Sequence, residues 1–157
     1  MLDHLLPRTI DNDYRGQKAA LWLLGLLLLM KTGMGLNSIL NGYKVATSAD
    51  GIPLDTYPPA AARTIVALFA IWGLGHFMLC LLGILVLARY RRVVPFMFAL
   101  FLVEHVSRKL ILQFRPIVRV GNPPASFINP ALLALTIVGL GLSLWSRGKV
   151  RVRNSPD

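Results

Sequence analysis

Long apolar stretches separated by short polar segments make up most of this chain. The apolar stretches cover residues 19–40, 64–88, 93–114 and 127–146. A bilayer core of about 30 Å is crossed by about 20 helical residues that rise about 1.5 Å each. The stretches are rich in leucine and lack the strict alternation of strands in a membrane barrel. The pattern therefore predicts four membrane-spanning helices.

A soluble all-helical protein is the alternative to a membrane protein. Hydrophobic residues make up 55% of the 157 residues, and four such stretches leave little chain for a polar surface. We therefore expect an all-α integral membrane protein, a four-transmembrane-helix antiparallel bundle formed by residues 19–146. Residues 1–18 are expected to form a cytoplasmic N-terminal tail, and residues 147–157 a basic cytoplasmic tail.

Positive charges are distributed unevenly between the connections. Ten Lys and Arg residues lie in the N-terminal tail, the second connection and the C-terminal tail, against four in the first and third connections. The positive-inside rule then predicts that both termini are cytoplasmic. The formal net charge of +10 is explained by this topology and by attraction to anionic lipid, so we do not expect nucleic-acid binding. A compact polytopic chain of this kind fits a bacterial inner membrane.

Turn-forming residues mark the connections between the predicted spans. The outer segment from residue 41 to 62 contains Asp50-Gly51 and three prolines, which predicts an ordered loop or a lid rather than a long helix. The connection at 89–92 is short, so the second and third spans are predicted to be antiparallel neighbours. Asn129 followed by Pro130 predicts an N-cap and the first residue of the fourth span.

Ionisable residues lie at one depth in three of the four spans. Lys31, His76, Glu104 and His105 all fall close to the midpoints of their stretches. A charged side chain at the bilayer centre costs about 2.5–3.5 kcal/mol, so such residues face the bundle interior and find partners. Glu104 is the only acid in any span, and we expect it to pair with Lys31 across helices or with Arg108 one turn along its own helix.

Small and polar residues recur at helical spacing in the spans that surround Glu104. Such residues allow close helix packing in lipid, so the sequence predicts that these faces turn inward. The predicted inward positions are Lys31, Gly35, Ser38 and Gly42 in the first span, Trp72, Gly73, His76, Cys80 and Gly83 in the second, and Thr136, Gly139 and Ser143 in the fourth.

Two interpretations of the polar layer follow directly from its charge. Lys31, Arg108 and Lys109 outnumber Glu104, and this excess of positive charge would suit a small anion, an anionic lipid or a lipid-like ligand, an ion or a proton. The predicted ligand-binding residues are Lys31, His76, Glu104, His105, Arg108 and Lys109. In the other interpretation the layer holds helices together, and the protein is a homo-oligomer or a subunit of a larger membrane complex.

A b-type haem protein for electron transfer is a further hypothesis. His76 and His105 are equally distant from the short connection at 89–92, so a hairpin would bring them to the same height. Two histidines on facing helices can supply both axial ligands of haem b. Gly73 and Gly75 would then make room for the macrocycle.

A lipid-modifying membrane enzyme is the last hypothesis, with Glu104 or His105 as general base. No nucleophile motif identifies catalytic residues, and Ser107 lies two positions from His105, on a different helix face. The single cysteine, Cys80, gives no metal cluster. The four-span layout is similar to that of several small bacterial membrane families, DoxX-like proteins among them, and this likeness implies only the helical bundle.

Overall fold

The computed structural model describes Asn12, Tyr14 and residues 16–145. The described part contains four long helices and no strand, in the order α2 (Lys18–Leu40), α4 (Pro59–Arg89), α5 (Val94–Phe114) and α6 (Ala125–Leu144). These helices overlap the four predicted apolar stretches. Most of residues 1–18 and all of the basic tail at 147–157 lie outside the described residues, as do six of the ten cations used for the orientation, namely Arg8, Arg15, Arg147, Lys149, Arg151 and Arg153.

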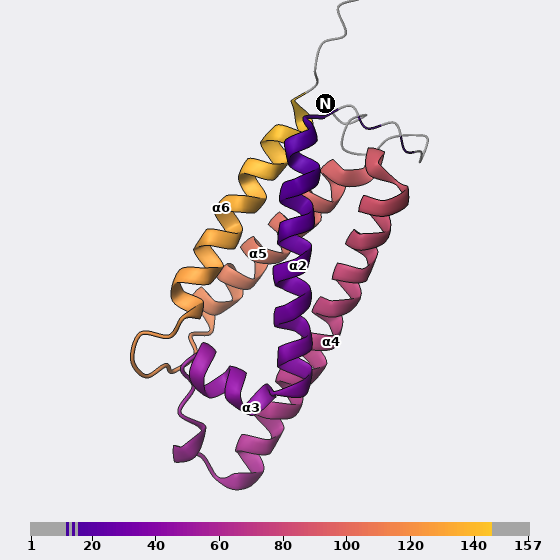
Figure 1. Ribbon diagram of the computed structural model, residues 1–157. Coiled ribbons are helices and arrows are strands. Elements are labelled where there is room, and N and C mark those ends of the chain that lie inside the picture. Colours follow the sequence, from indigo (N-terminus) through magenta and orange to yellow (C-terminus); the bar gives the residue numbers. More distant parts are fainter. Residues whose placement is uncertain (1–11, 13, 15, 146–157) are drawn as a thin grey trace, which may run out of the picture.

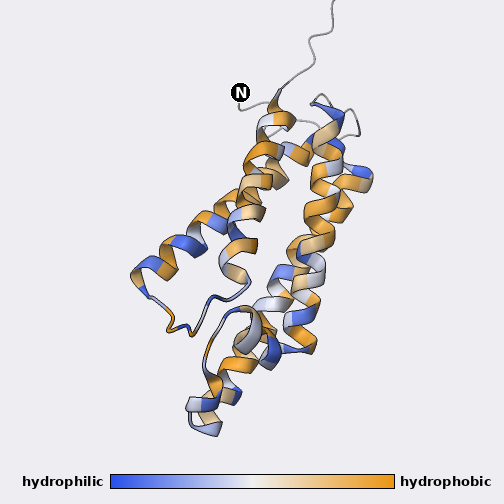
Figure 2. Ribbon diagram, turned by 60° about the vertical axis from the view of Figure 1, so that its left-hand side comes forward, coloured by the Kyte–Doolittle hydropathy of each residue, from blue (hydrophilic) through white to orange (hydrophobic). Residues whose placement is uncertain are grey.

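Three of the four helices, α2, α4 and α6, are long and apolar enough to cross a membrane. Helix α5 has 21 residues, but it carries Glu104, Arg108 and Lys109. Figure 2 shows hydrophilic positions interspersed along the half of α5 that leads into the connection to α6. The described fold is thus all-helical with three candidate spans, and α5 differs from them in charge rather than in length.

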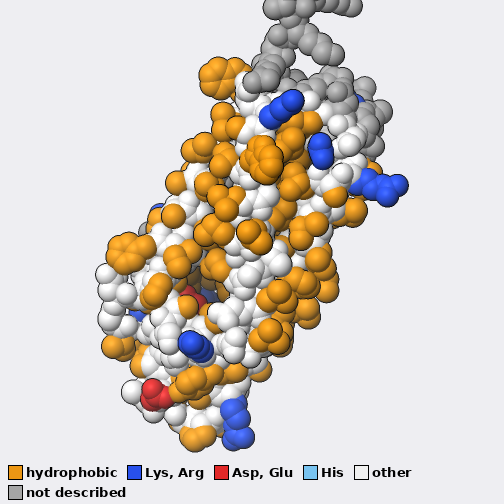
Figure 3. Space-filling view, viewed as in Figure 1, with side chains coloured by type: hydrophobic (Ala, Val, Ile, Leu, Met, Phe, Trp, Pro, Cys, Tyr) orange, Lys and Arg blue, Asp and Glu red, His pale blue; other side chains and the backbone are white. Residues whose placement is uncertain are grey.

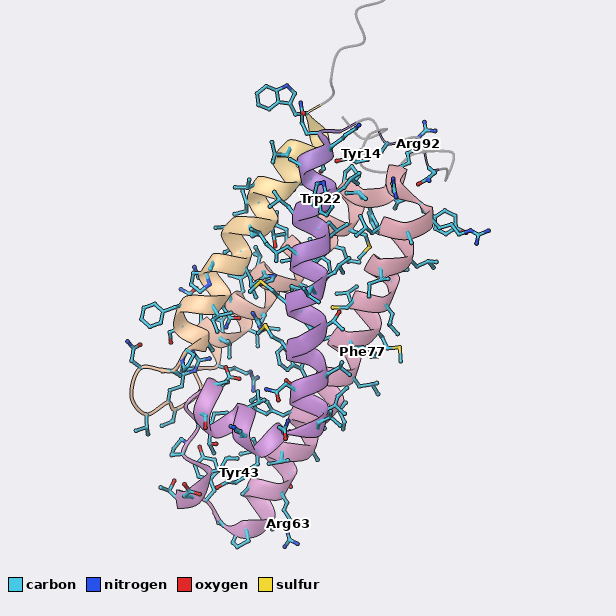
Figure 4. All side chains as sticks on the ribbon, viewed as in Figure 1. Tyr14, Trp22, Tyr43, Arg63, Phe77 and Arg92 are labelled. Atoms are coloured by element: carbon cyan, nitrogen blue, oxygen red, sulfur yellow. The ribbon has the colours of Figure 1, made fainter. Side chains whose placement is uncertain are left out.

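The helices run along one another, with α2 packed against both α4 and α6 (Figure 1). We call the two ends of the bundle the turn end, with Tyr14 and Arg92, and the loop end, with Tyr43 and Arg63 (Figure 4). Helices α4 and α5 are joined at the turn end by the 3-10 turn η3 (Arg91–Val93). They are antiparallel as predicted. With distance from the turn end they diverge, because α4 packs mainly on α2 and α5 packs mainly on α6.

Glycines explain these packing partners. A Cβ atom on Gly73 would lie 2.8 Å from the carbonyl oxygen of Gly35, so the backbones of α2 and α4 touch at this point. On the other side of the bundle, the Phe98 ring of α5 fills the space beside Gly139 of α6, where a Cβ atom would overlap it. The predicted small-residue faces of α2, α4 and α6 are therefore confirmed as packing faces, but Trp72 is exposed, so its predicted inward position is wrong.

Two helix starts differ from the prediction. Helix α4 begins at Pro59, ahead of residue 64, because proline is well suited to the first turn of a helix. Helix α6 begins at Ala125, with Pro124 as its N-cap, so the predicted start at Asn129-Pro130 is wrong. The amide groups of Ser126 and Phe127 already donate to the carbonyls of Pro123 and Pro124, and Pro130 lies inside the helix.

The connection between α2 and α4 forms a packed cap at the loop end. It consists of α3 (Gly42–Lys44), the π-helical turn η1 (Val45–Ala49) and the 3-10 turn η2 (Leu54–Thr56). Three of its residues, Ala46, Ile52 and Leu54, are buried against the first turns of α4. Gly51 has a positive φ of 74°, and its carbonyl accepts a hydrogen bond from Val120 of the α5–α6 connection at 2.8 Å. The two loop-end connections are thus tied together.

Candidate functional site

The predicted polar residues of α2 and α5 meet in the interior of the bundle. Lys31 is 1% exposed, and its Nζ donates to Oε2 of Glu104 at 2.8 Å. The same ammonium lies 4.9 Å from the centre of the Phe101 ring. The cross-helix pairing of Lys31 with Glu104 is therefore confirmed. It places a charged pair between helices that otherwise have little contact with each other.

His105 is 5% exposed and is fixed by one side of its ring. Its Nδ1 lies 2.9 Å from the carbonyl oxygen of Phe101 and 3.3 Å from Oε2 of Glu104. Both neighbours are acceptors, so we assign the hydrogen of the neutral ring to Nδ1. The other nitrogen, Nε2, is buried and has no hydrogen-bond partner among the described residues. A buried lone pair of this kind is costly to leave unpaired.

Arg108 does not pair with Glu104, contrary to one of the two expected pairings. Its Nη2 donates to Oδ1 of Asn129 on α6 at 2.9 Å, and its guanidinium carbon lies 5.6 Å from the centre of the Trp72 ring on α4. Among the described residues, no carboxylate lies within 4.0 Å of it. Its positive charge is held by a neutral amide and an aromatic face.

A cavity of about 210 Å³ lies between these groups and the cap. Figure 3 shows a hollow on this face of the molecule, with acidic and basic atoms visible in its depth. Most of the lining is apolar, with polar groups from every long helix, as is usual for small-molecule sites. The polar lining residues are Lys31, Asn37, Ser38, Asp50, Trp72, His76, His105, Arg108 and Asn129.

The loop-end boundary of the cavity includes an acid. Asp50 lines the cavity, and its Oδ1 lies 4.0 Å from Nη2 of Arg119 in the α5–α6 connection. Burial of this carboxyl raises its pKa above the usual value of 3.8, and the neighbouring guanidinium groups of Arg119 and Arg108 oppose the change. The cavity is therefore bounded on this side by a weakly held ion pair.

Four of the six predicted ligand-binding residues, Lys31, His76, His105 and Arg108, line the cavity, and Glu104 and Lys109 do not. Five polar residues that line it were not among those six, namely Asn37, Ser38, Asp50, Trp72 and Asn129. Lys109 is exposed, although it lies one turn after His105 on α5. Asn129 was assigned to a helix cap, and Asp50 to a turn. Neither has a local pattern that marks it as part of a site, because each reaches the cavity only through contacts with other segments.

Haem does not fit the residues present. The space beside Gly73 is occupied by the backbone of α2, and Gly75 has no neighbouring atom within 4 Å of an added Cβ. The His76 ring is covered by Trp72, with ring centres 5.7 Å apart. A cavity of about 210 Å³ is also smaller than the range of about 300–1,000 Å³ that is typical for drug-sized ligands.

Two kinds of reactive group, a metal site and a nucleophile beside His105, are not seen in the described residues. Those residues contain no group of three His, Cys, Asp or Glu side chains arranged to hold a metal ion. Ser107 is exposed, so it does not approach the His105 ring as a nucleophile would. Comparisons of this chain with protein families, with curated proteins and with solved structures find no match.

Proposed function

We propose that this chain is a small polytopic membrane protein that binds a lipid-like ligand with an anionic head group in the cavity between its helices. The observation that carries the proposal is the position of Arg108. It lines the cavity, and among the described residues no carboxylate lies within 4.0 Å of it. An anionic head group in the cavity would pair with its guanidinium group.

The proposed topology has four crossings, both termini in the cytoplasm and a place in a bacterial inner membrane. In this topology α5 is the third crossing, and its 21 residues span about 32 Å at about 1.5 Å each. Its charges are compatible with that position, because Glu104 is paired and Arg108 is shielded by Trp72. Lys109 is exposed in the half near the loop end, where a long side chain can reach the interface.

The topology is tested with reporter fusions at the C-terminus and at Gly121 in the α5–α6 connection. Green fluorescent protein fluoresces only on the cytoplasmic side, and alkaline phosphatase is active only outside. We expect fluorescence from the C-terminal fusion and phosphatase activity from the fusion at Gly121. Phosphatase activity at the C-terminus would contradict the proposed orientation.

Apolar lining beside polar groups indicates the shape of the ligand. Met34, Ile128 and Leu132 line the cavity together with Arg108. A short alkyl chain would contact the first three, while an acidic head would contact Arg108. The cavity volume of about 210 Å³ limits the ligand to a short chain or to one end of a longer lipid.

Trp72 allows binding to be measured directly, because it lines the cavity and contacts Arg108. The other two tryptophans, Trp22 and Trp145, do not line the cavity, and replacing them with Phe leaves Trp72 as the only tryptophan. In this background, purified protein in nanodiscs is titrated with 8-bromooctanoate, whose bromine quenches nearby tryptophan. The neutral 8-bromooctanol measures quenching by partition into the lipid alone.

We expect saturable quenching by the acid, and only a linear, weak effect of the alcohol. Arg108→Gln should weaken binding of the acid at least tenfold, because a hydrogen bond to a charged group contributes about 1.5–3 kcal/mol. Lys109→Gln is the matched control, since it removes the same charge from the adjacent, exposed position. Equal quenching by acid and alcohol, or equal loss in both variants, would contradict the proposal.

A further inference from the structure

We propose that the cavity binds a phospholipid head group that carries a primary ammonium beside its phosphate, as phosphoethanolamine does. Arg108 pairs with the phosphate, and the Asp50 carboxylate accepts hydrogen bonds from the ammonium. This inference rests on the proposed binding function and names the class of head group. An anion alone would use only Arg108 and would leave the opposite charge in the same cavity without a partner.

The cationic side of the site is Arg108 on α5, which is half-buried and lines the cavity. A guanidinium group has five N–H donors, and one of those of Arg108 is directed to Oδ1 of Asn129. Other N–H donors are left for a phosphate, which guanidinium groups bind with two parallel hydrogen bonds. Asn129 thus orients the guanidinium group without neutralising it.

The anionic side of the site is Asp50 in the cap, whose side chain is 21% exposed and lines the same cavity. Its Oδ1 lies 4.0 Å from Nη2 of Arg119, which is too long for a hydrogen bond. Burial raises the pKa of this carboxyl even though Arg119 and Arg108 oppose the change, so its negative charge is incompletely compensated. A ligand ammonium would supply both positive charge and N–H donors.

The other titratable groups around the cavity leave these two roles to Arg108 and Asp50. The titratable lining residues are Lys31 of α2, His76 of α4, His105 and Arg108 of α5, and Asp50 of the cap, while α6 contributes the neutral Asn129. Lys31 is already paired with Glu104. The two histidines are 8% and 5% exposed, so they offer a ligand little surface. One cation and one anion therefore remain accessible, on different segments of the chain.

The order of the lining groups along the bundle matches the order of groups in a phospholipid. Asp50 belongs to the cap at the loop end, and Arg108 contacts Asn129, which lies in the second turn of α6. Leu132 lies three residues further along α6, about 4.5 Å further from the loop end. A lipid with its ammonium at Asp50 and its phosphate at Arg108 therefore directs its chain towards the apolar lining at Leu132 and Met34.

Displacement of 8-bromooctanoate from the Trp72-only protein tests this preference, because displacement restores the fluorescence of Trp72. The nanodiscs are made of phosphatidylcholine, whose methylated ammonium has no N–H donor. The competitors share a hexyl chain and a phosphate: hexyl phosphoethanolamine, hexyl 2-hydroxyethyl phosphate and hexylphosphocholine. We expect the first to displace the probe at a concentration about tenfold below that of either other compound, in line with the strength of hydrogen bonds between charged groups.

Two variants of the cap assign the preference to Asp50. Asp50→Asn keeps the size of the side chain but removes its charge, so the preference should fall to about threefold or less. Quenching by 8-bromooctanoate should persist in this variant and shows that the cavity is still formed. Asp55→Asn is the matched control, since Asp55 is exposed in the same cap, does not line the cavity and keeps an oxygen to accept from Tyr43. It should keep the wild-type preference.

The outcomes separate this inference from the proposed function. Quenching by 8-bromooctanoate together with equal displacement by the ammonium and hydroxyl compounds, or by the ammonium and choline compounds, overturns recognition of the ammonium and leaves anion binding intact. A preference that persists in Asp50→Asn overturns the role of Asp50. Equal displacement by phosphoethanolamine without a chain overturns the lipid as the source of the head group. Absence of quenching by 8-bromooctanoate in the wild type overturns the proposed function and the inference together.

Discussion

Replacing Gly73 with Ala should destabilise the bundle, although alanine is the better helix former. The structure brings α2 and α4 into backbone contact at this point. An added Cβ atom would lie 2.8 Å from the carbonyl oxygen of Gly35 and 2.8 Å from Cβ of Ser38. Ordinary van der Waals contact begins at 3.4 Å, so the helices must move apart by several tenths of an ångström. A backbone carbonyl cannot rotate away as a side chain would.

The size of the effect follows from two opposing contributions. Inserting a methyl group into a closely packed site costs about 1–3 kcal/mol. Replacing glycine with alanine inside a helix contributes about 0.8–1.0 kcal/mol in the opposite direction. Gly75→Ala isolates the second contribution, because an added Cβ atom at Gly75 meets nothing within 4 Å. The difference between the two variants should therefore be about 1–3 kcal/mol.

Thermal unfolding in a mild detergent measures this difference. A chain of this size changes its melting temperature by about 2–4 °C for each kcal/mol, so Gly73→Ala should melt roughly 2–12 °C below Gly75→Ala. Adding Ser38→Gly to Gly73→Ala removes one of the two obstacles and should restore part of the loss. If Gly73→Ala and Gly75→Ala melt at the same temperature, the close contact of α2 with α4 is not present and the packing argument fails.

Two further predictions concern the charges of the interior and the cap. Lys31→Met should lower stability, by up to about 3–5 kcal/mol, because it leaves the partly buried Glu104 carboxylate without its cation, and Lys31→Met/Glu104→Leu should recover most of the loss in the same melting assay. The raised pKa of Asp50 means that the folded state binds a proton more tightly than the unfolded state. Stability should therefore rise as the pH falls through the window above 3.8, and Asp50→Asn should remove this gain.

The packing faces could be predicted from the sequence because small or polar residues in a leucine-rich membrane helix mostly lie where that helix contacts another helix. Gly35, Gly73 and Gly139 stand out for that reason, and all three lie at helix contacts. The choice of packing partners could not be predicted in this way. The short α4–α5 connection suggested that these two helices pack together, but a connection only fixes where two helices meet. Side chains that fill glycine faces, such as Phe98 beside Gly139, determine which helices stay together.

In the candidate site, too, some contacts could be predicted from the sequence and others could not. Lys31 and Glu104 could be paired from the sequence because opposite charges at one depth have few other partners. Asn129 could not be recognised, since an asparagine before a proline has an ordinary local explanation as a helix cap. Its amide instead accepts a hydrogen bond from Arg108, which comes from another helix 21 residues away in the chain. Contacts between segments that are distant in the chain cannot be recognised from the sequence pattern around each residue.

The Lys31–Glu104 pair also bears on how the chain is made. In the proposed topology α2 enters the bilayer first, and its counter-ion lies 73 residues further along. Until α5 has been synthesised and inserted, the ammonium has no acid to pair with, at a cost of about 2.5–3.5 kcal/mol. The nine leucines of α2 contribute about 0.3–0.6 kcal/mol each towards insertion, which is enough to hold the helix in place. The free-energy cost of the unpaired Lys31 ammonium is thus removed only when α5 joins the bundle. A chain truncated before Glu104 is therefore expected to be a better substrate for membrane quality-control proteases than the full chain.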